Sequence, residues 1–485
     1  MRGPGRAHPL LILLFFPIAA LVLSGCDNGP FSSDRTKLRA AQVQVDDPLY
    51  GEQWYLPMIR AEQAWQLVAD HEVRTGRLST VPVAVIDSPI DRDHPDLRDV
   101  LTAEKIVFIT DGTDAEKLPD SHGTHVAGLA GARGGNAIGI AGSAFNASAP
   151  AYAPIMGIAS LKANNGGGSV GDLADAILYA SGYENSSEQI PARPARVINM
   201  SLGAPSLPGP EEALLREVIR LAAKADVVMV AAAGNAREGA PSGGTVVDYP
   251  ARFSEVIAVG SITSTSELSW FSHHGPDLEI VAPGGGGAER NSDGLLLVST
   301  LPGNNYGLQA GTSMAAPLVA GVAAMIRSVN PDLTAPEVRA ILRETALDLG
   351  EAGRDDQFGY GLVNAEAAIE AAIRAGRGTD TVLRGRALDP TPSYSLSAGS
   401  RIPAPWDPAG SRDIAILLDQ DALDRMGVTD AAGRIRETTG LDVRGEGPLL
   451  RGTLPRELDG DVVLHTLYDL GFVLSALQDR VLAWR

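Results

Sequence analysis

The stretch that decides the fold lies at residues 83–87 and reads VAVID. Its four apolar residues, three of them β-branched, are typical of a strand that is buried on both faces. The stretch ends in the carboxylate of Asp87, which is costly to bury unless a hydrogen-bond donor or a cation lies beside it. We therefore predict a central strand of a parallel sheet with a polar group at its carboxyl end.

Short β-branched runs alternate with longer, alanine-rich amphipathic stretches on either side of this strand. The predicted strands are Val83–Ile86, Ile106–Ile109, Ile155–Leu161, Val197–Met200, Val227–Ala232 and Val256–Val259. The predicted helices are Ala61–Ala69, Thr124–Ala130, Asp172–Ala180, Glu211–Ala223, Ala315–Val329 and Pro336–Glu344. This alternation predicts an α/β fold, a parallel β-sheet with helices on both faces, over residues 47–375. In such sheets the functional site lies beyond the carboxyl ends of the strands.

Beyond this predicted domain the composition changes. Residues 376–410 are rich in Gly, Pro, Ser and Thr and are interpreted as a linker. Residues 411–485 contain strand-like stretches at Ile414–Leu418 and Leu449–Leu454 and a possible helix near Asp421–Met426, which together predict a small C-terminal α/β module of unknown role. The net charge of −19 is spread along the 485 residues and argues against nucleic acid or an anionic lipid surface as a charge-driven partner.

The N-terminal residues read as a secretion signal. Two arginines precede an apolar run from Leu10 to Leu23, and small residues follow, so residues 1–25 are interpreted as a signal peptide. A membrane span is a weaker interpretation, because the run is short and is interrupted by Pro17. We therefore expect an exported protein.

Cys26, the only cysteine, directly follows this signal. The sequence Leu23-Ser24-Gly25-Cys26 resembles the lipobox of bacterial lipoproteins, which implies lipidation of Cys26 and anchorage at a membrane of the bacterial cell envelope. Residues 26–46, which are polar, would then be a tether. The alternative is an ordinary signal peptide followed by an unused thiol.

Two further segments carry groups that complement Asp87. Residues 122–128, HGTHVAG, place His122 and His125 at the start of a helical pattern, and residues 311–317, GTSMAAP, place Ser313 at the entry of an apolar helix. Each segment alone has an ordinary explanation, as a turn residue, a structural or metal-binding histidine pair, or an N-cap serine. Together they supply an acid, a base and a nucleophile in the chain order Asp, His, Ser.

The strings VAVIDSPI, HGTHVAG and GTSMAAP resemble the three motifs of the subtilisin-like serine peptidases. Further similarity in DPLYGEQW, VINMSLG, VMVAAAGN, YPA and VIAVG extends the resemblance over about Asp47 to Ala375. It implies peptide-bond hydrolysis by a catalytic triad of Asp87, His122 and Ser313. His122 would accept the proton of Ser313, and Asp87 would fix the imidazole tautomer. His125 would have a structural role.

The resemblance also implies residues that bind the substrate. Asn235 would donate a hydrogen bond to the oxyanion, together with the backbone N–H of Ser313. Polypeptide substrates would add as an extended strand to exposed backbone edges. The implied substrate-binding residues are Ser201, Leu202, Gly203, Ala232, Ala233, Gly234, Gly166, Gly167 and Gly168. Asp248 would lie at the floor of the specificity pocket and favour lysine or arginine at the cleaved position. The alternative, that Asp248 hydrogen bonds its own loop, stays open.

Calcium is the metal that the resemblance suggests. Asp47, Asp96 and Asn136 match positions that coordinate a structural calcium ion in many relatives, and oxygen ligands from separate loops suit that ion. The alternative is that all three are turn residues. No cofactor is expected for catalysis.

Two features depart from the family pattern. Pro89 stands in the loop after Asp87 where relatives usually have glycine, and proline fixes φ and removes an N–H. Relatives often carry a folding-assisting propeptide, but only about twenty residues separate Cys26 from Asp47, too few for such a domain. Either the enzyme folds unaided, or residues 411–485 supply an equivalent function.

Three other functions are alternatives. A silent binding protein on the same fold conflicts with the intact triad and Asn235. An esterase or lipase usually shows a Gly-x-Ser-x-Gly elbow and the order Ser, Asp, His, which this sequence does not have. A surface adhesin with incidental activity would depend on residues 411–485.

Overall fold

A parallel sheet forms the centre of the larger domain. The computed structural model describes residues 39–110, 117–145, 152–163, 167–236, 244–289 and 294–376, and, with gaps, 413–482. Seven strands follow the order β2-β3-β1-β5-β6-β7-β8, all paired in parallel. They are β1 (Val83–Asp87), β2 (Ile106–Val107), β3 (Ile155–Ala159), β5 (Val197–Met200), β6 (Val228–Ala232), β7 (Val256–Ile262) and β8 (Ile280–Pro283). The predicted α/β fold is confirmed.

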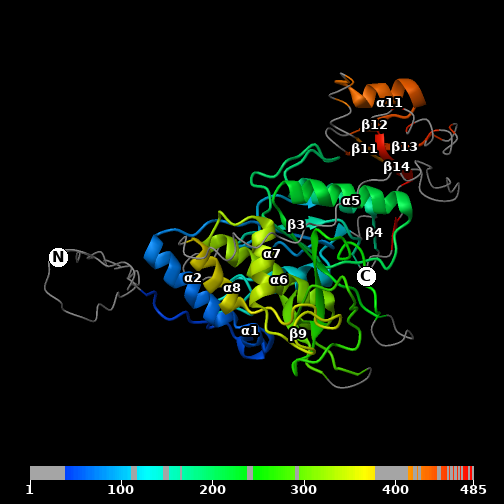
Figure 1. Ribbon diagram of the computed structural model, residues 1–485. Helices are drawn as coiled ribbons and strands as arrows, with labels where there is room; N and C mark the ends of the chain where they lie inside the picture. Colours follow the sequence, from blue (N-terminus) through cyan, green and yellow to red (C-terminus); the bar gives the residue numbers. More distant parts are fainter. Residues whose placement is uncertain are drawn as a thin grey trace, which may run out of the picture.

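Helices cover both faces of this sheet (Figure 1). One face carries α4 (Val170–Ala180) and α5 (Gly209–Lys224), which pack on each other, with α4 lying against β1 and β3. The other face carries α2 (Ala61–Thr75), α3 (Ser121–Gly131), α6 (Thr312–Val329), α7 (Ala335–Thr345) and α8 (Ala365–Gly376). Two short turns, η2 (Tyr50–Glu52) and α1 (Tyr55–Met58), precede α2.

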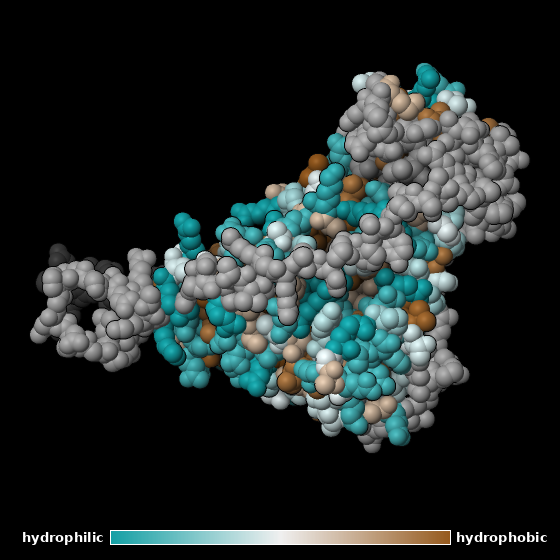
Figure 2. Space-filling view, viewed as in Figure 1, coloured by the Kyte–Doolittle hydropathy of each residue, from teal (hydrophilic) through white to brown (hydrophobic). Residues whose placement is uncertain are grey.

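The position of the central helix α6 (Thr312–Val329) explains why this segment is so apolar. All of its 18 residues are buried, and it contacts β5, β6, β7 and β8. Among the described helices it alone is long and apolar enough to cross a membrane, yet it lies wholly inside the protein. A helix that is apolar on every side suits such a central position. The described residues on the face shown in Figure 2 are mostly hydrophilic, and apolar ones are scattered among them.

The elements differ from the prediction mainly at their ends. The strand expected at Ile106–Ile109 stops at Val107, and α2 continues to Thr75. The elements that were not predicted include β8, α8, and the hairpin of β9 (Leu297–Leu301) and β10 (Asn305–Gln309).

The last residues of the predicted tether lie along α2. The backbone N–H of Ala40 donates to Asp70 Oδ1 at 2.8 Å, and that of Val43 donates to Gln66 Oε1 at 2.9 Å. Val43 and Val45 pack against the core. The predicted signal peptide, the rest of the tether with Cys26, and nearly all of the predicted linker lie outside the described residues.

A second, four-stranded antiparallel sheet lies in the C-terminal module, which Figure 1 draws in orange and red beside α5. Its strand order is β12-β13-β11-β14. The elements are β11 (Asp413–Leu418), α11 (Ala431–Thr439), β12 (Val443–Arg444), β13 (Leu449–Thr453) and β14 (Val473–Gln478). A two-residue strand after it, β15 (Val481–Leu482), pairs with β4 (Gly168–Ser169) of the larger domain.

Candidate active site

The carboxylate of Asp87 is buried at the carboxyl end of β1. Its exposure is 0%, and its Oδ1 accepts hydrogen bonds from the backbone N–H of Ser88 and from His122 Nδ1, both at 2.7 Å. Its Oδ2 has no hydrogen-bond partner among the described residues. The carboxylate is therefore removed from water and is held on one side only.

His122 lies in the first turn of α3, next to Asp120. Asp120 is the N-cap of this helix and accepts a 2.9 Å hydrogen bond from the backbone N–H of His122. The His122 side chain is 28% exposed. Burial alone would lower the pKa of His122, but the charge and hydrogen bond of Asp87, and the charge of Asp120, raise that pKa above its ordinary value. The surroundings therefore favour the imidazolium.

Glycine at position 123 permits this arrangement. A Cβ on Gly123 would lie 2.1 Å from the carbonyl oxygen of Ser88, so only glycine lets α3 approach the loop after β1 this closely. The Gly123 N–H donates to the Ser88 hydroxyl at 3.0 Å. Pro89, in the same loop, accepts a 2.7 Å hydrogen bond from the Asp120 N–H through its carbonyl, so the proline leaves this contact intact.

The second histidine, His125, is buried and serves the packing of the hairpin. Its Nε2 lies 3.0 Å from the carbonyl oxygen of Leu297 and 3.2 Å from that of Gly307. Burial lowers its pKa to about 3, so the ring is neutral. His125 therefore ties α3 to β9 and β10, in keeping with the structural role expected for it.

Ser313 is the second residue of α6, and Ser201 holds it in two ways. Pro317 has no N–H to donate to the Ser313 carbonyl four residues earlier, so the Ser201 hydroxyl donates to that oxygen at 2.7 Å. The Ser313 hydroxyl in turn donates to the carbonyl of Ser201 at 3.3 Å rather than to His122. Catalytic hydrogen bonds are often long or unformed without substrate.

Asn235 presents a free amide beside Ser313. Its Oδ1 accepts hydrogen bonds from the N–H and the hydroxyl of Thr312, at 3.0 and 3.2 Å, which assigns the oxygen end of the side chain. Its Nδ2 has no described protein partner. The N–H of Ser313 also lies in the first turn of a helix, where donors are left without intrahelical acceptors. Two donors therefore lie next to the Ser313 hydroxyl.

These groups open onto one pocket of about 320 Å³. Its lining includes His122, Ser313, Asn235, Ser201 and Gly167. A proton acceptor, a hydroxyl, two N–H donors and a backbone edge thus share one cavity. Such a set suits acyl transfer through a covalent intermediate.

Two segments that were predicted to wall a specificity pocket lie close to Asp248. Ser201 to Gly203 directly follow β5. Ala232 is the last residue of β6, and Ala233 and Gly234 follow it. A Cβ on Gly203 would lie 3.0 Å from the Asp248 Cβ, and one on Gly234 would lie 2.5 Å from Asp248 Oδ2, so the aspartate sits between both walls. Asp248 also lies 3.1 Å from His273 Nδ1, a partner that the sequence had not indicated. Gly166 lies outside the described residues.

The three candidate calcium ligands come together around residues 135–140. Asp47 accepts from the N–H of Gly135 at 2.6 Å, and Asp96 Oδ1 accepts from Asn136 Nδ2 at 3.0 Å. Burial raises the pKa of both carboxyl groups, and the charge of Asp96 adds to the effect at Asp47. The oxygen-rich set fits a hard cation. Among the described residues, however, no three His, Cys, Asp or Glu side chains form a metal-binding cluster.

Known proteins are similar to this chain in sequence and in fold. A family model described as "Subtilase family" matches residues 79–361. Subtilisin amylosacchariticus of Bacillus subtilis subsp. amylosacchariticus is 38% identical over 292 residues, which cover 60% of this chain and 66% of that protein. The halolysin-like extracellular serine protease Nep of Natrialba magadii is 32% identical over 349 residues, covering 71% of this chain and 56% of that protein. The chain thus spans less than two thirds of the length of either relative.

A solved structure agrees with the sequence relatives. A protease of Pseudoalteromonas arctica superimposes with a TM-score of 0.56 at 29% identity. The match covers 68% of this chain and 100% of that one.

Proposed function

Because the chain belongs to the subtilase family, we propose that it is a serine endopeptidase with Asp87, His122 and Ser313 as its triad. The observation that carries this proposal is the 2.7 Å contact of the buried Asp87 with His122, whose side chain lines the same pocket as Ser313. Asn235 supports it, since its free amide lines that pocket.

In this mechanism Ser313 first turns its hydroxyl from the Ser201 carbonyl to His122 Nε2. Oγ then attacks the carbonyl carbon of the peptide bond while His122 takes the proton, and Asp87 stabilises the imidazolium through Nδ1–H. The oxyanion accepts hydrogen bonds from Asn235 Nδ2 and the Ser313 N–H. His122 returns the proton to the leaving amine, which departs and leaves an acyl-enzyme. Water, deprotonated by His122, then hydrolyses the ester and restores the Ser313 hydroxyl.

Fluorophosphonate labelling tests this proposal. We expect the full chain to be labelled and Ser313→Ala not to be, and we expect hydrolysis of peptides as well as activated esters. Absence of labelling in a folded chain would favour a silent binding protein. Hydrolysis of esters alone would favour an esterase.

We also propose that Asp248 gives a preference for lysine or arginine at the cleaved position. Its support is the place of the carboxylate between the two pocket walls. His273 shares this carboxylate, so we expect His273→Ala, which removes the ring and its contact, to strengthen the preference by freeing the aspartate for substrate. The measurement is kcat/KM for matched peptides with Arg, Lys, Phe or Leu at that position. A preference for Phe would end the idea.

Calcium is proposed to bind at Asp47, Asp96 and Asn136. These residues would hold the ion between the N-terminal segment and the 135–140 loop, and the ion would stabilise the fold without entering the reaction. The test is thermal melting with calcium and with EDTA. We expect a lower Tm in EDTA, and an unchanged Tm would count against the site.

Export with a lipid anchor at Cys26 is proposed from the signal-like N-terminus, and the extracellular relative supports export. Mass spectrometry of the mature protein should find an N-terminal, diacylated Cys26. Cys26→Ser should move the protein from the membrane fraction to the soluble fraction. A mature chain that begins elsewhere, with a free thiol or no cysteine, would contradict the anchor.

A further inference from the structure

The C-terminal strand β15 is seated beside the pocket. Val481 pairs with Ser169 and Leu482 with Gly168, in antiparallel register. The strand that they join, β4, directly follows Gly167, which lines the pocket with His122 and Ser313. An exposed strand edge is also what an extended peptide uses to bind, through main-chain hydrogen bonds. The chain's own strand therefore takes an edge that a substrate would need.

The C-terminal module that carries β15 has an apolar face that packs against the larger domain. Side chains alternate between the two faces of a strand, and β11 uses both faces. Ile414 and Ile416 pack with Ile435 of α11 in the module's own core, whereas Ala415 belongs to the core of the larger domain. In β13, Leu450 and Leu449 divide in the same way. The module's sheet thus has one apolar face for itself and one for the larger domain, where β14 meets α5.

A buried ion pair fixes this docking. Arg451 of β13 lies 3.1 Å from Asp172 and 2.6 Å from Asp175, and its side chain is 13% exposed. Both aspartates belong to α4, the helix that begins where β4 ends, and both are almost fully buried. Burial raises the pKa of Asp175, and the charge of Arg451 opposes this. Two carboxylates are costly to bury in this way without a cation, and the module supplies it.

From this docking we infer that residues 411–485 are an intramolecular inhibitor, which holds β15 on the substrate-binding edge of β4 and lowers the activity of the enzyme toward extended peptides until the module is displaced. The inference rests on the proposed peptidase function and extends it to regulation. An inhibitor blocks a folded enzyme, whereas the folding aid considered from the sequence would be needed only before the fold is complete.

A proline pair in the full-length chain tests the strand contact. Val481→Pro with Leu482→Pro removes two backbone N–H groups and prevents regular strand pairing. Val481→Ala with Leu482→Ala keeps both N–H groups and serves as the matched control. We expect the proline pair to raise kcat/KM for an extended peptide substrate by about tenfold, which corresponds to about 1.4 kcal/mol of lost docking. The alanine pair should raise it much less.

Arg451→Ala tests the ion pair separately. We expect it to raise kcat/KM in the same direction. Arg436→Ala is its control, because Arg436 pairs with Asp442 on the surface of the same module, 2.8 Å away. If Arg451→Ala fails to fold, the proline pair still decides, since it changes neither Arg451 nor the strands β11 and β13 of the module.

The outcomes separate the two claims. Equal kcat/KM in the unaltered chain and in the proline pair would overturn the inhibitory role of the module. A lower yield of folded protein from the proline pair, with kcat/KM unchanged, would overturn it too. In both cases the proposed peptidase function would stand. Failure of every variant to hydrolyse peptide or react with fluorophosphonate would remove the proposed function and the inference with it.

Discussion

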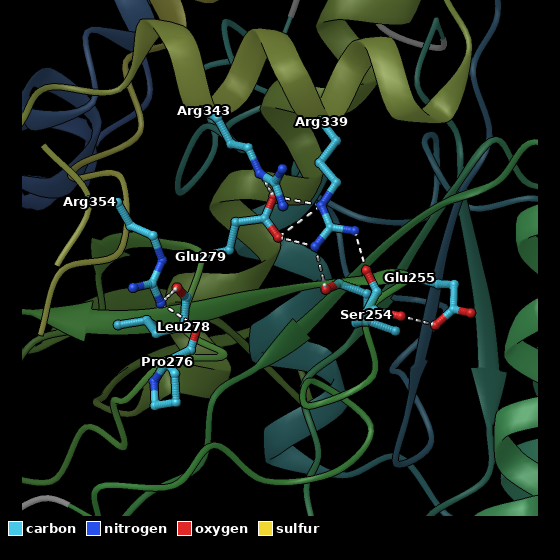
Figure 3. A network of polar contacts seen from close by, with 9 residues as sticks. Ser254, Glu255, Pro276, Leu278, Glu279, Arg339, Arg343 and Arg354 are labelled. Atoms are coloured by element: carbon cyan, nitrogen blue, oxygen red, sulfur yellow. Dashed lines mark hydrogen bonds and ion pairs between the residues drawn. The ribbon is translucent and has the colours of Figure 1, made fainter. Parts of the chain in front are cut away.

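Two buried carboxylates of this protein, Asp87 and Glu279, have very different partners. Glu279, which is 4% exposed just before β8, lies 2.7 and 2.9 Å from Arg339 Nε and 2.7 Å from Arg343 Nε (Figure 3). Both arginines project from α7, and Arg339 also reaches the carbonyl of Ser254, so the network joins α7 to the loop before β7. Asp87 has one histidine, one backbone N–H and the Ser88 hydroxyl, all on one oxygen.

The difference concerns what each carboxylate can still do. Burial raises the pKa of Glu279, but Arg339 and Arg343 outweigh it and the pKa lies below its ordinary value. Glu279 is thus fully neutralised and serves as a joint between elements. The partner of Asp87 is a histidine that gains its charge only when it takes a proton, so Asp87 stabilises a charge that appears during the reaction.

Asp87→Asn should give the largest effect of the two sites. The amide would no longer fix the His122 tautomer, and we expect kcat to fall about ten-thousandfold. The Tm should not fall, because a buried and half-satisfied charge is removed. Peptide hydrolysis and thermal melting check the two halves. A large drop in Tm together with kcat would mean that Asp87 is chiefly structural.

Glu279→Gln should lower the stability of the fold and leave kcat unchanged. Removing one partner of a buried ionic network leaves two arginines facing each other, and we expect a loss of about 3 kcal/mol in the free energy of unfolding. The kcat per titrated active site should be unchanged. Because the folded-state pKa of Glu279 is depressed, its contribution is complete above the ordinary pKa of 4.5 and is lost as the pH falls through the folded-state value. Denaturant melts of both chains should therefore converge in acid, and a constant difference would contradict this account.

Asn235→Ala comes next in size. Loss of an oxyanion donor should lower kcat about a hundred- to a thousandfold with little change in KM, a magnitude known from subtilisin, a relative, rather than derived from this chain. Thr312→Val is the comparison, since it removes only one of the two donors that hold Asn235 Oδ1. It should lower kcat far less. Equal losses would show that the positioning of the loop, rather than the Asn235 amide, is what matters.

The sequence predicted the strands around Asp87 well, because near-continuous apolar runs are a local property. It did not indicate the partners that tertiary packing supplies. The need of the Ser313 carbonyl for a donor follows from Pro317, but nothing local identifies Ser201 as that donor. Arg451 and Asp172 are 279 residues apart, and only the docked module brings them together.

Two of the elements that were not predicted have a sequence pattern that indicates them. The hairpin of β9 and β10 turns at Pro302-Gly303-Asn304, where Gly303 and Asn304 both have positive φ, and this is a common composition for a tight turn. Helix α8 has alanines and isoleucines at helical spacing, so its period was visible. Strand β8 has only four residues and ends in Pro283, which weakens any strand pattern.

Asp120→Asn should give the smallest effect, and it tests how much of the raised pKa of His122 comes from a carboxylate other than Asp87. The base His122 must be neutral to accept a proton, so kcat/KM rises with pH through the His122 pKa, which Asp87 and Asp120 raise. Asparagine keeps the N-cap oxygen that accepts from the His122 N–H but removes one negative charge. The acid limb of the pH profile should therefore move to lower pH while the plateau stays. Asp356→Asn, which removes an exposed charge paired with Arg354, should leave the limb in place. If the Asp120→Asn limb did not move, Asp87 alone would raise the pKa of His122, and a limb that moved to higher pH would contradict the effect of the Asp120 charge.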